Sequence, residues 1–486
     1  MKKLILDAFC LLVRRSFNGG GLLVACFIMP ATVNAQTIPQ KLQKAFQQFE
    51  KDTQLSHAIS SLYVIDANTG QVVFKRNSQV GLAPASTQKI ITGVTAFELL
   101  GKGFRYKTEL RYDGKIQKEK LSGMMYMFCS GDPTFGSWRF KQTSRDSILK
   151  NFSKAINNAG IKSFDKEEGF FGIDNRKFEK PNIPDGWIWQ DLGNYYGAGC
   201  DCMNWRENQY DLILRSGKNI GDPVKVDFGS PGEPHLEYIG MESDVVSAAK
   251  GTGDNAYIYY PFYQKVFVKG TIPVNETSFK ISGAMPAPGR TFQVELFEEA
   301  QKFKIEAPFD EFDPWQINNE NPPQVLYTHY SPTLDSIIYW FNKRSINLYG
   351  EALIKTFAYE KQGFASTDSG IAILKDFWKQ KGMDVEEINI VDGSGLSPLN
   401  RVTTHAQVEI LKYAKNRNWF PLFYNSLPEF NGMKIKSGTI RGVKGFCGYH
   451  KAKNGKEYIF SFLVNNYSGS PSALVSKMYK VLDVLK

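Results

Sequence analysis

Two segments at opposite ends of the chain share one pattern, in which two strand-like runs joined by a tight turn lie next to a helix. The runs, each pair separated by a turn that contains Asn and Gly, are residues 59–66 and 71–75 near the N-terminus and 445–451 and 458–464 near the C-terminus. A helical pattern over residues 36–56 precedes the first pair, and an amphipathic helix that begins at Ser470-Pro471 follows the second.

Three further helical patterns lie between these end segments. They cover residues 86–100, a stretch that starts with Ser331 as N-cap and Pro332 at the first helical position, and residues 348–360. A helix, a hairpin, central helices, a second hairpin and a terminal helix indicate an antiparallel sheet packed between helices, which is an α/β fold.

The middle of the chain has a different character. From residue 108 to residue 324 it consists of short strand-like runs separated by Gly, Pro, Asn and Asp. A chain of 486 residues has room for roughly two to four domains. We therefore expect residues 36–107 and 325–486 to form one domain, with β-rich domains inserted at 108–324. The composition, with 42% hydrophobic and 22% charged residues, excludes a disordered, a collagen-like and a polytopic membrane protein.

Residues 1–35 are predicted to be a secretory signal peptide rather than part of the fold. Basic residues precede an apolar run over 19–31, and Val33-Asn34-Ala35 supplies the small residues of a cleavage site before Gln36. The apolar run is too short for a transmembrane helix. Lipidation at Cys26 stays open as an alternative, although apolar residues continue past Cys26, where a polar tether is expected.

The charge and the metal-ligating residue types narrow the classes of partner. The net charge is +10, but the chain has no dense run of Lys or Arg and no nucleic-acid-binding motif, so we expect a solvated basic surface with room for an anionic substrate. The five histidines are scattered, so neither a metal nor a cofactor is expected. The aromatic content of 14% is attributed to a well-packed core, with a sugar-stacking surface as the alternative.

Ser86 and Lys89 form a Ser-x-x-Lys pattern at the predicted start of the helix 86–100. A serine in a first helical turn lies near unpaired main-chain N–H groups and the positive end of the helix dipole, which both stabilise negative charge. Lys89 projects from the same face, and its amine can take the hydroxyl proton if burial or a neighbouring cation lowers its pKa. On its own, the pattern also fits a capping serine followed by a solvated lysine.

Two further motifs strengthen the case for a nucleophilic serine. Ser345 and Asn347 lie in the predicted break between two helices, where a hydroxyl and an amide can both face a cleft. Lys436-Ser437-Gly438-Thr439 lies on a predicted strand, where the glycine permits close approach and the lysine offers a charge to a carboxylate. The three motifs in this order, on a helix start, a helix break and a strand, are typical of β-lactamases and penicillin-binding proteins.

The sequence resembles the class C low-molecular-mass penicillin-binding proteins, which are D-alanyl-D-alanine carboxypeptidases/endopeptidases, over essentially the whole chain after residue 35. A large insertion between the first and second motifs is also a feature of that family. Ser437 stands where the family usually has Thr, which keeps a hydroxyl group. The stretches that carry the resemblance are residues 84–89, 130–133, 191–199, 345–351 and 392–397.

This resemblance implies the fold of penicillin-binding proteins and serine β-lactamases, and a role for each motif residue. Ser86 would form the acyl-enzyme with Lys89 as its base, and Ser345 would relay a proton to the leaving amine. The main-chain N–H groups of Ser86 and Thr439 would form the oxyanion hole. The residues that would bind the substrate, with Lys436 and Thr439 on its terminal carboxylate, are Asn347, Lys436, Ser437, Gly438 and Thr439.

We therefore predict an exported, serine-type D-alanyl-D-alanine carboxypeptidase/endopeptidase that acts on peptidoglycan stem peptides and is acylated by β-lactams. Two alternatives stay open. The first is a secreted β-lactamase or esterase with the same motifs, for which so long an insertion would be superfluous. The second is a non-catalytic peptidoglycan-binding protein that has kept the fold. The oligomeric state is left open.

Overall fold

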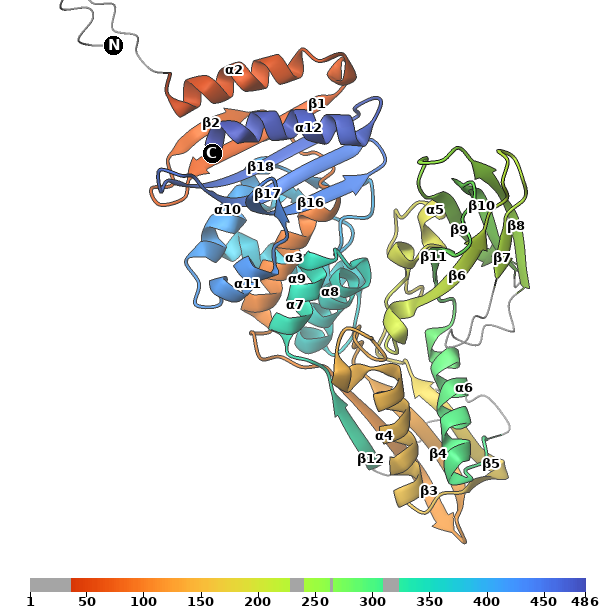
Figure 1. Cartoon of the computed structure of the whole chain (residues 1–486). Helices are drawn as coiled ribbons and strands as arrows, with labels where there is room; N and C mark the ends of the chain where they lie inside the picture. Colours follow the sequence, from red (N-terminus) through yellow and green to blue (C-terminus); the bar gives the residue numbers. More distant parts are fainter. Residues whose placement is uncertain (1–35, 228–239, 263–264, 309–322) are drawn as a thin grey trace, which may run out of the picture. The chain divides into compact units, whose positions relative to one another are not determined.

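A six-stranded antiparallel sheet joins the two ends of the chain in the computed structural model, which describes residues 36–227, 240–262, 265–308 and 323–486 (Figure 1). The strand order is β15-β16-β17-β18-β1-β2, and β18 pairs with β1 from Ile59↔Asn465 to Asp66↔Tyr458. Its strands are β1 (Ile59–Asp66), β2 (Val72–Arg76), β15 (Glu429–Phe430), β16 (Met433–Ile440), β17 (Val443–Lys451) and β18 (Glu457–Asn465). The predicted signal segment 1–35, including Cys26, lies outside the described residues.

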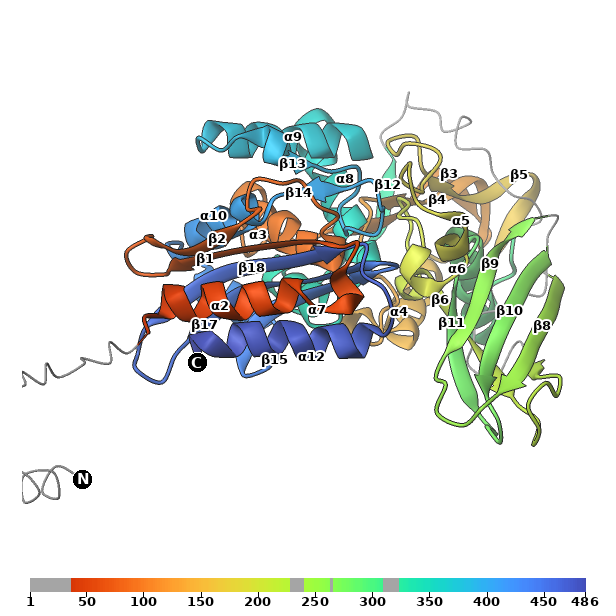
Figure 2. The same cartoon turned by 90° about the horizontal axis from the view of Figure 1, so that it is seen from above.

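Helices cover both faces of this sheet (Figure 2). Helices α2 (Ile38–Glu50) and α12 (Pro471–Leu482) contact each other on one face, and α3 (Lys89–Leu99) and α10 (Thr404–Lys415) lie on the other. The remaining helices on this second side are α7 (Leu334–Lys343), α8 (Asn347–Gln362), α9 (Thr367–Gln380) and α11 (Phe420–Ser426). Since both faces are covered, β1 is buried over nearly all its length instead of alternating, with Leu62 in one core and Tyr63 in the other.

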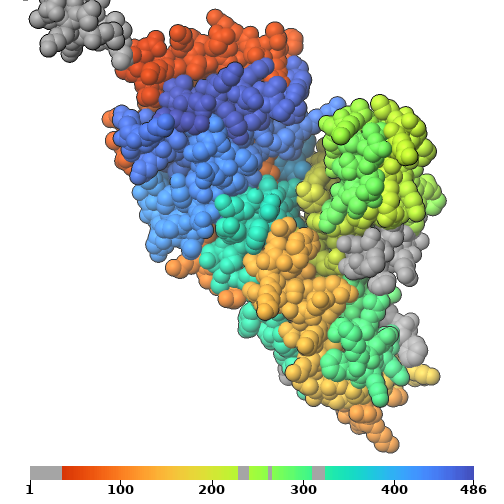
Figure 3. All heavy atoms as spheres, in the orientation of Figure 1, coloured from red at the N-terminus to blue at the C-terminus, as the bar shows by residue number. Residues whose placement is uncertain are grey.

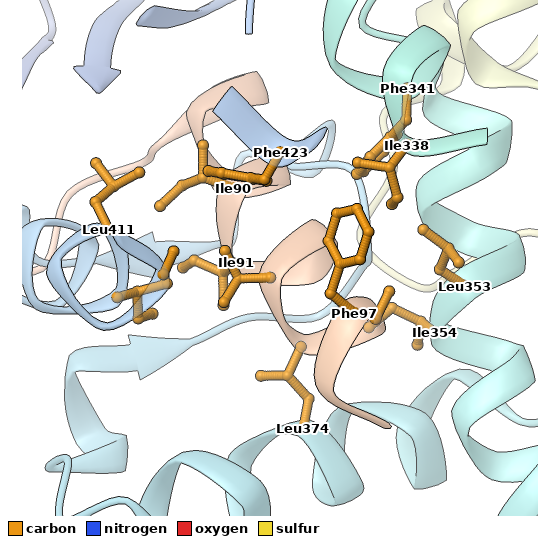
Figure 4. Close-up of a cluster of buried hydrophobic side chains, with 14 of the residues drawn as sticks. Ile90, Ile91, Phe97, Ile338, Phe341, Leu353, Ile354, Leu374, Leu411 and Phe423 are labelled. Carbon is orange, nitrogen blue, oxygen red and sulfur yellow. The ribbon is translucent and has the colours of Figure 1, made fainter. Parts of the chain in front are cut away.

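The hydrophobic core on the α3 side fixes the position of this helix. Ile90, Ile91 and Phe97 of α3 pack against apolar side chains from α7, α8, α9, α10 and α11 (Figure 4). This burial on every side explains why the run predicted at 86–100 is apolar rather than amphipathic. The predicted helix boundary at Ser331 was wrong: α7 starts at Leu334 with Thr333 as N-cap, because the Ser331 hydroxyl already accepts a hydrogen bond from the Tyr106 N–H group.

The described residues between β2 and α7 form three further sheets. Sheet β12-β3-β4-β5 is formed by β3 (Lys107–Gln117), β4 (Lys120–Cys129), β5 (Ser163–Asp174) and β12 (Gln324–Tyr330). Sheet β11-β6-β7 is formed by β6 (Gln209–Arg215), β7 (Lys225–Asp227) and β11 (Phe279–Ala284), and sheet β8-β10-β9 by β8 (Gly240–Ala248), β9 (Asn255–Phe262) and β10 (Lys265–Pro273). The last of these forms much of the light-green surface in Figure 3.

Helices also occur in the region that was predicted to be β-rich. Helices α4 (Arg145–Asn158) and α6 (Pro288–Ala300) contact each other and share an apolar core with the neighbouring sheets, and a short helix α5 (Trp189–Leu192) precedes the turn at Tyr195–Gly197. A two-stranded pair, β13 (Ile388–Asn389) with β14 (Arg401–Val402), flanks the loop between α9 and α10. Among the described residues, no helix has both the length and the apolar character needed to cross a bilayer.

Candidate active site

Ser86 lies on a tight 3₁₀ turn, Ala85–Gln88, that leads directly into α3. The turn is closely packed, because a Cβ atom added at Gly438 of β16 would come within 2.6 Å of the Pro84 carbonyl oxygen. A Cβ atom at Gly395 would come within 2.0 Å of the Ala85 carbonyl oxygen. Ala85 itself has a φ of 46°, a region that residues other than glycine rarely adopt. Two glycines on distant segments therefore let the chain clamp the serine turn from both sides.

Lys89 lies beneath Ser86, at the first position of α3, and its side chain is fully buried. Its Nζ atom donates hydrogen bonds to Ser86 Oγ at 2.9 Å and to Asn347 Oδ1 at 2.7 Å. A third bond reaches the main-chain carbonyl of Ser394 at 2.7 Å. Burial, and next the positive charge of Lys436, hold the pKa of Lys89 well below the usual lysine value. An amine with a lowered pKa next to a hydroxyl is the arrangement that general-base activation of a serine requires.

The second motif occupies the break between α7 and α8. Ser345 has a φ of 56°, which ends α7, and Asn347 is the first residue of α8. The amide of Asn347 connects two parts of the chain, because its Oδ1 accepts from Lys89 while its Nδ2 donates to the Tyr196 carbonyl at 2.7 Å. This residue therefore fixes both the lysine and the inserted segment that contains Tyr196.

The third motif brings a second buried lysine to the site. Lys436 Nζ donates to Ser345 Oγ at 2.8 Å and to the Ser437 carbonyl at 2.8 Å. Burial, reinforced by the nearby Lys444, lowers the pKa of Lys436 to about 7. Thr439 is exposed three residues after Lys436 on β16, and its hydroxyl accepts a hydrogen bond from Lys444 at 2.7 Å. The two lysines thus reach the two hydroxyls, Ser86 and Ser345, from below.

A cleft of about 1010 Å³ opens above these groups. Four of the sequence-predicted residues line it, namely Ser86, Ser345, Asn347 and Thr439, while Lys89 and Lys436 are buried below. Gly438 packs against the serine turn, and Ser437 contributes its main-chain carbonyl. The inserted region supplies the facing wall, which includes Ile188, Asp191, Tyr195, Tyr196 and Tyr257.

The loop at residues 392–397 contacts the site directly. Its sequence predicts a tight loop and does not predict the hydrogen bond that its Ser394 carbonyl accepts from Lys89. Asp392 is fully buried and holds the loop closed, because its carboxylate accepts hydrogen bonds from the Gly395 and Ser397 N–H groups and from the Trp187 indole. The run of Gly and Ser after an Asp is a signal of tight backbone packing, but Lys89, the partner of Ser394, is 305 residues away in sequence.

A second buried carboxyl group, that of Glu351, lies on α8 beside the same loop. Glu351 Oε2 accepts a hydrogen bond from the Gly393 N–H group at 2.9 Å. Burial, and next the nearby Asp392, raise the pKa of Glu351 to about 8, so this carboxyl group is largely neutral at pH 7. Within the described part of the chain, no group of three or more His, Cys, Asp or Glu is placed to hold a metal ion. Cys129, Cys200, Cys202 and Cys447 are buried and unpaired.

Comparison with known proteins places this site in a family. The model of the D-Ala-D-Ala carboxypeptidase 3 (S13) family matches residues 42–429. The chain therefore belongs to this family of serine peptidases, which confirms the predicted resemblance, the fold and the class of enzyme.

Individual relatives agree with this assignment. The chain is 25% identical over 455 residues to a D-alanyl-D-alanine carboxypeptidase of Actinomadura sp. (strain R39), covering 86% of this chain and 80% of the relative. It is 24% identical to the D-alanyl-D-alanine carboxypeptidase DacB of Haemophilus influenzae, covering 93% and 92%. The crystal structure of penicillin-binding protein 4 (dacB) from Haemophilus influenzae superposes with a TM-score of 0.75 at 22% identity, covering 91% of this chain and 98% of that one.

Proposed function

We propose that this protein is a D-alanyl-D-alanine carboxypeptidase/endopeptidase that hydrolyses peptidoglycan stem peptides through an acyl-enzyme on Ser86. The observation that carries the proposal is the position of Lys89 Nζ, 2.9 Å from Ser86 Oγ, in a fully buried site that lowers the pKa of the amine. A lowered pKa increases the neutral fraction of the amine at a given pH, and the neutral amine can accept the hydroxyl proton.

In the acylation step, Ser86 Oγ attacks the carbonyl carbon between two D-alanines while its proton passes to Lys89. Collapse of the tetrahedral intermediate breaks the C–N bond, and the leaving amine needs one proton. Ser345 is placed to relay it: its hydroxyl, hydrogen-bonded to Lys436 at 2.8 Å, gives its proton to the amine and takes up the proton that Lys89 received from Ser86, so that Lys89 is neutral again. Water then attacks the ester while Lys89 accepts its proton, and Lys89 passes that proton to Ser86 Oγ as the acyl C–O bond breaks, which releases the acid and restores Ser86.

The other motif residues are proposed to bind the substrate. The amide of Asn347 lies next to Lys89 and would hold the substrate main chain. Lys436, Ser437 and Thr439 would take the terminal carboxylate, with Gly438 allowing the strand to approach the serine turn. The N–H groups of Ser86 and Thr439 would form the oxyanion hole, where each donor is typically worth ~3–4 kcal/mol. β-Lactams would acylate Ser86 by the same route; a solved structure of penicillin-binding protein 4 from Haemophilus influenzae is described as complexed with a β-lactam.

The domain organisation and location are also proposed. Residues 36–107 and 325–486 would form the catalytic domain, since both segments contribute strands to one sheet and helices to its faces. Residues 108–324 would form inserted domains. The inserted sheet extends to Tyr330 through β12, six residues beyond the predicted boundary. With residues 1–35 as a signal peptide, the protein would act in the bacterial cell envelope on stem peptides rather than on nucleic acid.

Labelling with a fluorescent penicillin tests the role of Ser86. The wild type should form a stable covalent adduct, the Ser86→Ala variant should form none, and Ser476→Ala on the exposed face of α12 should label like the wild type. Equal labelling of Ser86→Ala and wild type would remove Ser86 from its role. Rapid loss of the label would favour the β-lactamase alternative. A stable adduct without release of D-alanine or cleaved crosslinks from muropeptides, followed by mass spectrometry, would favour a binding protein.

A further inference from the structure

The outer face of the sheet β8-β10-β9 carries side chains that its fold does not explain. In β10 the side chains alternate, with Val266 and Val268 buried in the core and Phe267 and Lys269 exposed. In the register of the sheet, Phe267 lies between Glu242 of β8 and Tyr259 of β9. Lys269 similarly lies between Asp244 of β8 and Tyr257 of β9. Two cross-strand rows, each with a carboxylate at one end and a tyrosine at the other, therefore face outward.

Aromatic side chains gather on this face and stay partly exposed. Phe267 is 40% exposed, and Trp189 of the short helix α5 is 53% exposed. The Trp189 and Tyr259 rings lie 4.8 Å apart between centroids. Together with Glu242, Asp244 and Lys269, these three rings line a hollow of about 320 Å³. An outward sheet face normally carries polar residues, so large exposed rings around a hollow indicate a binding surface.

The hollow and the wall of the catalytic cleft are lined by neighbouring residues. Tyr257 lines the cleft and Tyr259 lines the hollow, and both point to the outer face of the same strand β9. The neighbouring residues Ile188 and Trp189 do the same on the α5 side, with Ile188 in the cleft and Trp189 in the hollow. A molecule bound across Ser86 would therefore extend along this surface if it were long enough.

We propose that this surface, formed by Trp189, Glu242, Asp244, Tyr259, Phe267 and Lys269, binds the glycan to which the stem peptide is attached. The inference rests on the proposed function, because that function supplies the covalent link between the peptide and an N-acetylhexosamine chain. The C–H faces of pyranose rings pack on flat aromatic rings, and the carboxylates and the ammonium group are suited to hydroxyl and acetamido groups. One row combines two rings with a carboxylate, and the other combines a ring with a carboxylate and an ammonium group. This mixture matches a neutral, hydroxyl-rich polymer better than an apolar protein surface or a strongly charged one.

A binding experiment on the inactive Ser86→Ala variant tests the surface independently of catalysis. The probe is the peptide-free tetramer of β-1,4-linked N-acetylglucosamine, followed by NMR or calorimetry. We expect Phe267→Ala to weaken binding at least fivefold and Phe267→Trp, which keeps a ring, to retain it. Phe364→Ala is the matched control, because Phe364 is a phenylalanine of similar exposure, 44%, on the loop after α8. Absence of binding by Ser86→Ala, or equal binding by Phe267→Ala, would overturn the proposal.

A kinetic comparison shows whether the surface serves the reaction. Release of D-alanine is measured from a disaccharide-linked pentapeptide and from the same pentapeptide without sugar. We expect the wild type to have a KM several-fold lower for the sugar-linked substrate, and Phe267→Ala to lose this difference while its kcat/KM for the free peptide stays unchanged. Equal KM values in the wild type would overturn the proposal. Failure of both substrates to react would instead contradict the proposed function. The binding experiment on the Ser86→Ala variant would still decide the glycan proposal.

Discussion

Lys89 and Lys355 are both almost completely buried, with 0% and 1% of their surfaces exposed, but they lie in opposite kinds of surroundings. Lys89 lies under the cleft and contacts neutral groups: a hydroxyl, an amide oxygen and a carbonyl. Lys355, on α8, lies where the inserted region meets the helices. It donates to the Cys200 carbonyl at 2.9 Å and the Asn182 carbonyl at 3.3 Å, and forms an ion pair of 3.4 Å with Glu179.

Under the proposed mechanism, the contrast separates a lysine that takes part in the chemistry from one that stabilises the structure. Since Lys89 has no carboxylate in direct contact and has Lys436 nearby, its charged form is disfavoured and its amine is available as a base. Burial raises the pKa of Glu179, but the hydrogen bond from Thr367 and the charge of Lys355 outweigh it and lower that pKa, which favours the ionised carboxylate. Lys355 thereby ties down the segment between Asn182 and Cys200.

Replacement of Lys89 by methionine is expected to give the largest effect on activity. Acylation by penicillin should slow by at least ~1000-fold, because the serine loses its base while its turn stays packed. The free energy of unfolding should change by no more than about 2 kcal/mol, since loss of the hydrogen bonds is offset by removal of a buried amine. Stopped-flow labelling and thermal denaturation measure the two quantities. A Lys89→Met variant that acylates at the wild-type rate would show that another group is the base.

The sequence predicted the surroundings of Lys89 far better than those of Lys355, for a physical reason. Ser86 and Lys89 are one helical turn apart, so their proximity follows from local geometry, and Lys436 and Ser345 belong to motifs with recognisable spacing. Lys355 carries no such signal, because its partners Asn182 and Cys200 are more than 150 residues away. The hydrogen bond from Trp187 to Asp392 likewise joins residues far apart in sequence and could not be predicted. Helices α4 and α6 were not predicted because they lie among turn-rich runs of the inserted region.

Replacement of Lys355 by methionine should reverse the pattern seen for Lys89. Removing the lysine leaves the Glu179 carboxylate with its hydrogen bonds from Thr367 but without its counter-charge, and leaves two carbonyl groups without the lysine donor. We therefore expect a loss of about 3 kcal/mol in the free energy of unfolding. Acylation should slow by less than ~10-fold, because Tyr196, which anchors Asn347, belongs to the loosened segment. Chemical denaturation and penicillin labelling measure these two effects.

The double variant Lys355→Met/Glu179→Gln is the matched control for this prediction. It replaces the Glu179 carboxylate by a neutral amide. If the uncompensated charge causes the loss of stability, the double variant should be more stable than Lys355→Met alone. If the single and double variants are equally unstable, the lost packing of the lysine stem is responsible instead. If Lys355→Met loses as much acylation as Lys89→Met, the separation between a chemical and a structural lysine is wrong.

The pH dependence of acylation should give the smallest effect, about tenfold per pH unit, and it should depend on the cleft lysines alone. Lys89 must be neutral to accept a proton, so the second-order rate constant should rise with pH until the lowered pKa of Lys89 is passed. Lys436 must be charged to hold a carboxylate, and its pKa of about 7 means that the rate constant should fall as the pH rises above that value. The profile of the free enzyme is therefore bell-shaped, and the two limbs belong to the coupled pair rather than to either lysine separately.

A penicillin whose carboxylate is esterified gains nothing from the charge of Lys436, so its rate constant should lack the alkaline limb while keeping the acidic one. Lys355→Met should show the same two limbs as the wild type, because its partners lie outside the cleft; a displaced limb in that variant would mean that the structural lysine also sets the protonation of the catalytic one.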